Sequence, residues 1–235
     1  MEGRDPAEVG GRHRDSLLYS RARWERWLLV ATIAVASIGL GYLFFTQIWW
    51  KTPPTFGCPE SFAFTGEGDE GQLVRTGGLC DWIGLGSFYA DQPETMGNAN
   101  IIRADPGPET SVPVGGLKSA YAAYIDNFIE PNIRWFGYMI WGGEAFIFLS
   151  LSLGFFSRLG AFTAVVISAH LTLGLAGIPN PSEWEWSYLL IVLLATAMFG
   201  IAPGRYFGLD RLLRPRFKLL SDRGSRVARL LHALT

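Results

Sequence analysis

Charged residues are scarce in this chain, and their scarcity argues against an ordinary soluble domain. Only 17% of the 235 residues are Asp, Glu, Lys or Arg, whereas 49% are hydrophobic and nine are tryptophan. Soluble domains carry roughly 25% charged residues, which keep their surfaces in water. A composition this apolar and this aromatic predicts an integral membrane protein.

Cysteine and histidine are also rare, and their positions argue against several kinds of site. The two cysteines, Cys58 and Cys80, are 22 residues apart and form no CxxC motif, which disfavours a redox-active dithiol. Of the three histidines only His170 falls within an apolar segment, which disfavours haem ligation. Neither a metal-ligand cluster nor a nucleotide-binding loop is evident in the sequence. We therefore expect no metal and no nucleotide.

Four apolar segments organise the chain. At ~1.5 Å per residue they approach the length needed to cross a hydrocarbon core of roughly 30 Å, and they cover about residues 28–50, 135–157, 159–178 and 186–202. The first 23 residues are polar, so no cleavable signal peptide is expected. We predict an all-α membrane protein, with residues 28–202 forming a four-helix transmembrane bundle.

Positive charge is concentrated in both tails. Residues 1–27 contain six Arg, and residues 204–235 contain seven Arg and one Lys, whereas the long loop 51–132 has eleven acidic residues against four basic ones. Cytoplasmic segments of membrane proteins carry the excess of Lys and Arg. We therefore expect a multi-pass protein of the cell inner (plasma) membrane with both termini cytoplasmic. The loop then faces the oxidising side, where Cys58 and Cys80 are expected to form a structural disulfide worth about 3 kcal/mol.

Two amphipathic stretches flank the apolar segments. A helix predicted at 116–130 either lies on the membrane surface or caps the top of the bundle, and its apolar face contains Leu117, Tyr121, Tyr124, Ile125 and Phe128. The tail 203–235 alternates basic residues with leucines and predicts one or two helices held at an anionic membrane face. Its expected partner is lipid or another subunit rather than nucleic acid.

Two ionisable residues inside the apolar segments are the strongest indication of function. Glu144 lies 14 residues before Arg158 and His170 lies 12 residues after it, so an antiparallel hairpin turning at Arg158 brings them to nearly the same depth. A charged side chain at mid-bilayer costs roughly 2.5–3.5 kcal/mol, so it usually faces protein and has a partner. We expect Glu144 and His170 to partner each other. Their simplest role is to hold two helices in register, and the alternative is catalytic proton transfer.

The residues around Glu144 suit a quinone. Trp141 and Phe148 share a helical face with this carboxylate. A quinone headgroup needs hydrogen-bond donors for its carbonyls, protons for its reduction and apolar walls for its ring. We expect Trp141 and Phe148 to bind the cofactor while Glu144 and His170 handle protons.

Several motifs resemble the DoxX/DoxD family of small four-helix membrane proteins. They are Gly143-Glu144 followed by an apolar stretch to Gly154 and Arg158, the ending Gly200-Ile-Ala-Pro-Gly-Arg-Tyr-Phe-Gly-Leu-Asp-Arg-Leu-Leu, and the shorter runs Trp50-Lys-Thr-Pro-Pro-Thr-Phe-Gly and Glu130-Pro-Asn. The similarity covers roughly residues 28 to 213. The resemblance implies a subunit of a thiosulfate:quinone oxidoreductase that works with a second membrane or periplasmic subunit. The competing interpretation is a non-catalytic accessory subunit of a larger respiratory or photosynthetic membrane complex.

Overall fold

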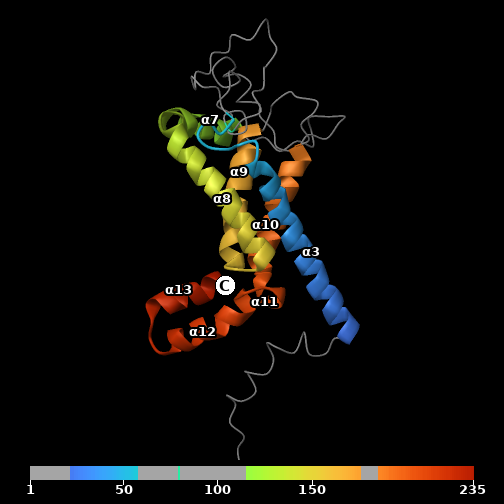
Figure 1. Cartoon of the computed structure of the whole chain (residues 1–235). Coiled ribbons are helices and arrows are strands. Elements are labelled where there is room, and N and C mark those ends of the chain that lie inside the picture. Colours follow the sequence, from blue (N-terminus) through green and yellow to red (C-terminus); the bar gives the residue numbers. More distant parts are fainter. Residues whose placement is uncertain (1–21, 58–78, 80–114, 176–184) are drawn as a thin grey trace, which may run out of the picture.

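The computed structural model describes residues 22–57, 79, 115–175 and 185–235. This part of the chain is all-helical and contains no strand, which confirms the predicted fold class at that level. Its four long helices pack lengthwise against one another (Figure 1), and they are α3 (Arg23–Ile48), α8 (Ile133–Leu153), α9 (Ser157–Leu175) and α10 (Glu185–Ile201).

Contacts between neighbouring helices fix an antiparallel arrangement. The Ser37 hydroxyl near the middle of α3 donates to the Leu151 carbonyl near the end of α8 at 2.9 Å. Nearer the end of α3, the Phe45 ring lies 4.5 Å from the ring of Phe148, which comes earlier in α8. α9 and α10 are antiparallel in the same way, because the start of α9 meets Phe199 near the end of α10.

Two of these helices have the length and composition of a membrane span. α3 and α8 pass both criteria, and α10 includes a shorter apolar stretch, Ser187–Ile201. Large apolar side chains face outward on α3, α8 and α10, among them Val35, Leu149 and Leu193. Because an aqueous surface would leave such side chains in contact with water, their outward position favours a lipid environment.

The turn between α8 and α9 lies earlier than the sequence predicts. The helix expected at 135–157 ends at Leu153, because Gly154 takes the left-handed conformation (φ 61°) and closes the helix with a bond to the Ser150 carbonyl. α9 begins only three residues later, so Arg158 belongs to its first turn. The Arg158 guanidinium donates to the carbonyls of Phe199 and Ala233 at 3.3 and 3.1 Å.

Asp210 ties the C-terminal tail to this turn. The tail forms α11 (Gly204–Phe207), α12 (Asp210–Asp222) and α13 (Arg226–Leu234), which lie across one end of the bundle (Figure 1). The buried Asp210 carboxylate accepts the Phe156 and Ser157 backbone N–H groups at 2.7 and 2.8 Å and the Ser157 hydroxyl at 2.7 Å. It thereby caps the N-terminus of α9, where a negative charge is favoured.

Three glycines, at positions 154, 204 and 208, let the tail approach the turn this closely. A Cβ atom on Gly154 would lie 2.6 Å from the Gly208 Cα and 2.8 Å from the Gly204 Cα, so a side chain cannot fit there. The Pro-Gly-Arg…Leu-Asp ending, the most specific of the family-like motifs, therefore has a structural role in this chain.

The segment before α8 caps the bundle. It consists of α7 (Gly115–Tyr124), a π-helical turn (Ile125–Ile129) and a short 3-10 turn (Glu130–Asn132) that continues into α8. Tyr121, Ile125 and Ile129 are buried, and α7 contacts α9. The structure thus adopts the capping alternative. The expected apolar face is only half buried, because Leu117, Tyr124 and Phe128 are exposed.

Asp210→Asn should destabilise the fold strongly. The substitution removes the charge and replaces one acceptor oxygen by a donor, so at least one buried N–H or O–H group at the turn loses its partner. We expect a loss of roughly 3 kcal/mol in the free energy of unfolding, measured by denaturation of the purified protein in detergent. Asp222→Asn, at an exposed position in the same helix, is the matched control and should change stability by less than about 0.5 kcal/mol. Equal stability of the two variants would refute the capping role.

Candidate functional site

A buried ion pair joins α3 to α8. The Lys51 Nζ donates to Glu144 Oε1, and the two side chains are 1% and 0% exposed. Lys51 follows α3, whereas Glu144 lies in the middle of α8. This is the only salt bridge between the residues that the structure describes. A charge pair so well enclosed stands in the low-dielectric interior, where breaking it leaves an uncompensated charge.

The chain that follows α3 encloses Lys51. Phe56 turns back into the bundle and is fully buried, with its ring 5.0 Å from that of Tyr138. The ring fits because residue 137 is glycine: a Cβ at Gly137 would lie 2.5 Å from it. The Lys51 Nζ also lies 4.5 Å from the Trp50 ring centroid, within cation–π distance. The run Trp49-Trp50-Lys51 at the end of the first apolar segment predicts an aromatic belt with a lysine that extends to the membrane interface. Because Lys51 is buried, this prediction is wrong.

Several buried polar atoms of α8 and α9 have no hydrogen-bond partner within the described part of the chain. Among them are Glu144 Oε2, Trp141 Nε1 and Ser168 Oγ. Trp141 precedes Glu144 by about one helical turn. Ser168 is on α9 next to Ile167, whose Cδ1 would lie 3.0 Å from a Cβ at Gly143. Since buried polar groups are nearly always paired in folded proteins, a carboxylate oxygen, an indole N–H and a hydroxyl are left to bind a proton or a ligand.

His170 has a different set of partners. Its Nδ1 lies 3.2 Å from the Tyr121 hydroxyl, which also donates to the His170 carbonyl at 3.3 Å. The imidazole ring is half-buried, and the rings of Tyr121, Tyr124 and Phe136 lie 5.6, 6.0 and 6.2 Å from it. His170 thus belongs to an aromatic cluster at the capped end of the bundle.

The predicted pairing of Glu144 with His170 is wrong, and the position of the turn explains why. With the turn at Gly154–Phe156, Glu144 lies 10 residues before it and His170 lies 14 residues after it. The His170 ring contacts Phe136, which is eight residues before Glu144 on α8. This contact likewise places His170 nearer than Glu144 to the start of α8. The two ionisable groups are therefore one to two helical turns apart along α8, which is about 6–12 Å.

The other predicted site residues have mixed positions. Trp141 is half-buried beside Glu144, whereas the Phe148 ring packs against Phe45 between α3 and α8. Cys58 and Cys80 lie outside the described residues, so their disulfide stays a prediction. Cofactor binding by Trp141 and Phe148 and the absence of a metal or nucleotide also stay predictions.

Comparisons of the chain with protein-family models, curated proteins and solved structures find no match. The resemblance to the DoxX/DoxD family therefore rests on the sequence motifs alone. Two of these motifs contain residues that make buried polar contacts in the structure. The Gly143-Glu144 run supplies the carboxylate of the ion pair, and the Gly200–Leu213 run supplies Asp210, which accepts hydrogen bonds from the α8–α9 turn.

Sequence reasoning missed the true partners of both ionisable residues. Lys51 stands directly after two tryptophans, a pattern typical of a membrane-interface anchor, and this hid its role. A signal was nevertheless present, because Lys51 is the only basic residue close to the outer end of the first apolar segment and a buried carboxylate needs a cation. Tyr121 gave no comparable signal, since its contact with His170 depends on how α7 packs.

Lys51 and Glu144 should show strong coupling in a double-mutant cycle. Glu144→Leu alone leaves a buried ammonium group unpaired, and we expect it to cost about 3–5 kcal/mol of unfolding free energy; the combined Lys51→Met and Glu144→Leu variant should recover most of that loss. Denaturation in detergent measures each variant.

The matched control for this cycle is Lys218→Met with Asp222→Leu, two exposed positions four residues apart on α12. Exposed pairs of this kind couple by less than about 1 kcal/mol. If the effects of Lys51→Met and Glu144→Leu were simply additive, the buried pair would not exist in the folded protein.

Proposed function

We propose that this chain is a membrane-embedded subunit of a quinone-linked oxidoreductase in which the Lys51–Glu144 pair exchanges protons at the quinone site. The observation that supports this most is a fully buried carboxylate, in a helix apolar enough to cross a membrane, with one oxygen that has no partner in the described part of the chain. Ionisable residues at such positions are costly, and they commonly mark proton or substrate pathways.

The proposal places all four long helices across the plasma membrane, with both tails in the cytoplasm. α3 and α8 have the required length and apolar character. α9 and α10 pack beside them at matching depth, and apolar side chains such as Phe162 and Leu190 face outward from these two helices. The distribution of basic residues between tails and loop supports the orientation.

Each polar group of the site has a defined task in this proposal. Reduction of a quinone, when one is bound, takes two electrons and two protons. In the ion pair Glu144 is a carboxylate. It would take up a proton on Oε2 and pass it to a bound quinone, and the Lys51 ammonium group would stabilise negative charge on a quinone carbonyl oxygen. The Trp141 indole N–H is available as a second donor. His170, half-exposed and bonded to Tyr121, is placed to pass protons toward the capped end.

The electrons come from outside the described residues. The family resemblance implies thiosulfate as the donor and a second subunit that oxidises it. This chain would then supply the quinone site and its protons, and its partner would supply the sulfur chemistry.

Glu144→Gln should abolish proton delivery while keeping a side chain of the same shape. We expect thiosulfate-dependent quinone reduction to fall about 100-fold or more, the usual effect of losing a positioned acid or base. The assay uses the chain with its co-purified partner in lipid nanodiscs and follows quinone absorbance. Glu25→Gln, a half-buried position in the first turn of α3 that has no part in the proposed site, is the matched control. Unchanged turnover in a correctly inserted Glu144→Gln protein would contradict the proposal.

A second candidate is the non-catalytic accessory subunit, and the tail favours it. α12 and α13 expose apolar side chains, including Leu212, Val227 and Leu230, next to a strongly basic surface. Such a surface suits docking to a larger membrane complex. Extraction of native membranes in mild detergent separates the two functions. Thiosulfate-dependent quinone reduction by the chain and one small partner supports the first, and inert co-migration with a large complex supports the second.

A further inference from the structure

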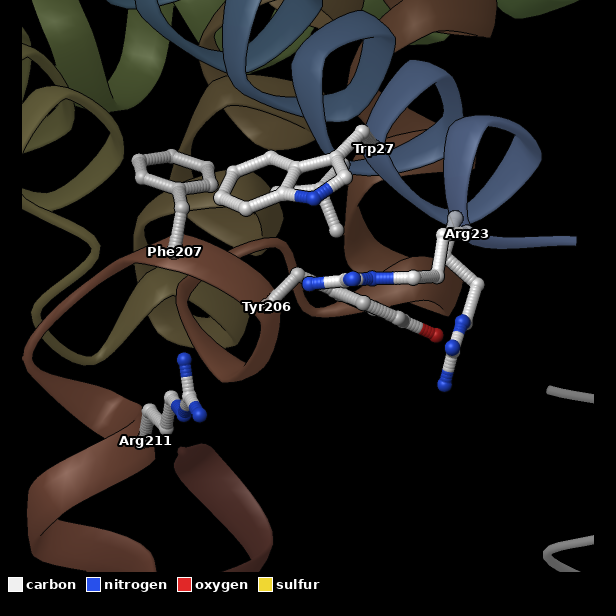
Figure 2. A pocket seen from close by; sticks show the side chains of 7 residues that line it. Arg23, Trp27, Tyr206, Phe207 and Arg211 are labelled. Carbon is white, nitrogen blue, oxygen red and sulfur yellow. The ribbon is translucent and has the colours of Figure 1, made fainter. Parts of the chain in front are cut away.

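A basic cavity lies between the start of α3 and the helices that follow α10. Its volume is about 400 Å³, and Figure 2 shows Arg23 and Arg211 on two sides of it with the Trp27 and Phe207 rings adjacent. The residues that line it are Arg23, Arg26, Trp27 and Val30 of α3, Tyr206 and Phe207 of α11, and Arg211 of α12.

The cavity carries uncompensated positive charge. None of its three guanidinium groups forms an ion pair with another described residue. Glu25, the nearest acid in the sequence, is not among the lining residues. The closest acid on the opposite side is Asp210, whose carboxylate already accepts three hydrogen bonds from the α8–α9 turn. Among the residues that the structure describes, the cavity lining therefore offers a bound anion three arginines and no carboxylate.

A second basic cavity extends this positive field. It has a volume of about 320 Å³, shares Arg211 with the first, and is also lined by Arg205, Arg214, Pro215, Lys218 and His232. Burial, together with the nearby charges of Arg158 and Arg214, lowers the pKa of Arg205 to about 10. Burial and the charges of Arg214 and Arg205 likewise lower the pKa of His232. Burial is the largest cause of both shifts, and neighbouring positive charges add to it.

The other side of the first cavity is apolar. Trp27 is 72% exposed, and it is followed by the charge-free run of α3 that begins at Leu28. In the proposed membrane placement this level of α3 is where lipid headgroups meet acyl chains, and tryptophan and arginine favour that boundary. The cavity thus presents arginines toward a headgroup and an indole ring toward a chain.

We propose that this cavity binds an anionic phospholipid, with Arg23, Arg26 and Arg211 around the phosphate and Trp27 against an acyl chain. The proposal depends on the membrane placement given above but not on the quinone chemistry. α3 contacts α11 at this end of the bundle. A lipid bound in the cavity would therefore link α3 to the segment formed by α11 and α12. It would therefore act as a structural lipid between the bundle and its basic tail.

The test compares two double variants of equal charge. Arg23→Gln with Arg211→Gln removes two cavity arginines, and Arg226→Gln with Arg229→Gln removes two exposed arginines of α13 that do not line it. Native mass spectrometry of the purified full chain in detergent measures binding of phosphatidylglycerol, phosphatidylcholine and inorganic phosphate. We expect the first variant to bind phosphatidylglycerol about 30-fold more weakly, at about 1 kcal/mol per arginine, and the second to bind like the wild type.

Trp27→Ala distinguishes a lipid from a soluble anion. Because Trp27 is exposed, its loss should leave the fold intact while weakening phosphatidylglycerol binding and leaving phosphate binding unchanged. Equal binding of phosphatidylglycerol and phosphatidylcholine by the wild type, or equal losses in both arginine variants, would overturn the proposal. If inorganic phosphate competed with phosphatidylglycerol at comparable concentration, the ligand of the cavity would be a soluble anion and the lipid proposal would be wrong. Glu144→Gln should not alter lipid binding, so the failure of one proposal leaves the other standing.

Discussion

The burial of a single ion pair constrains how this chain can fold. Lys51 and Glu144 are 93 residues apart in the sequence, and neither can enter an apolar interior without the other. Their contact sets the register of α3 against α8, with the residues that follow α3 level with the middle of α8. It also requires the chain after α3 to fold back, which Phe56 does by packing over Gly137. The pair therefore links the position of the first helix to the shape of the segment that follows it.

Asp210 fixes the end of the bundle at the α8–α9 turn in a comparable way. Its carboxylate caps α9 and holds the tail against the α8–α9 turn, and the glycines at 154, 204 and 208 allow the backbones to meet. With these two buried carboxylates in place, the apolar faces of the helices need only match in size and shape. The interior of the bundle is accordingly filled by ordinary aliphatic and aromatic residues such as Leu40, Ile147 and Ile167.

The sequence predicted the helices well and their side-chain partners poorly. Long apolar runs marked the four long helices, because a helix that crosses or packs in an apolar medium needs mostly apolar residues. The α8–α9 turn was misplaced because Arg158 was the only charge between the two apolar runs, whereas the turn depends on Gly154 and on Asp210, 56 residues away. Because the turn was misplaced, the sequence predicted His170 at the same depth as Glu144. The true partner, Lys51, is set by tertiary packing of a loop, which no local pattern encodes.

The proposed function requires that Glu144 take up and release a proton beside Lys51 in the folded bundle. Infrared difference spectroscopy of the chain in lipid nanodiscs, recorded between oxidised and reduced quinone, observes this carboxyl group directly. We expect a carboxylic-acid C=O band that changes with the quinone redox state and is lost in Glu144→Gln. A spectrum without such a band, or with the same band in Glu144→Gln, would contradict it.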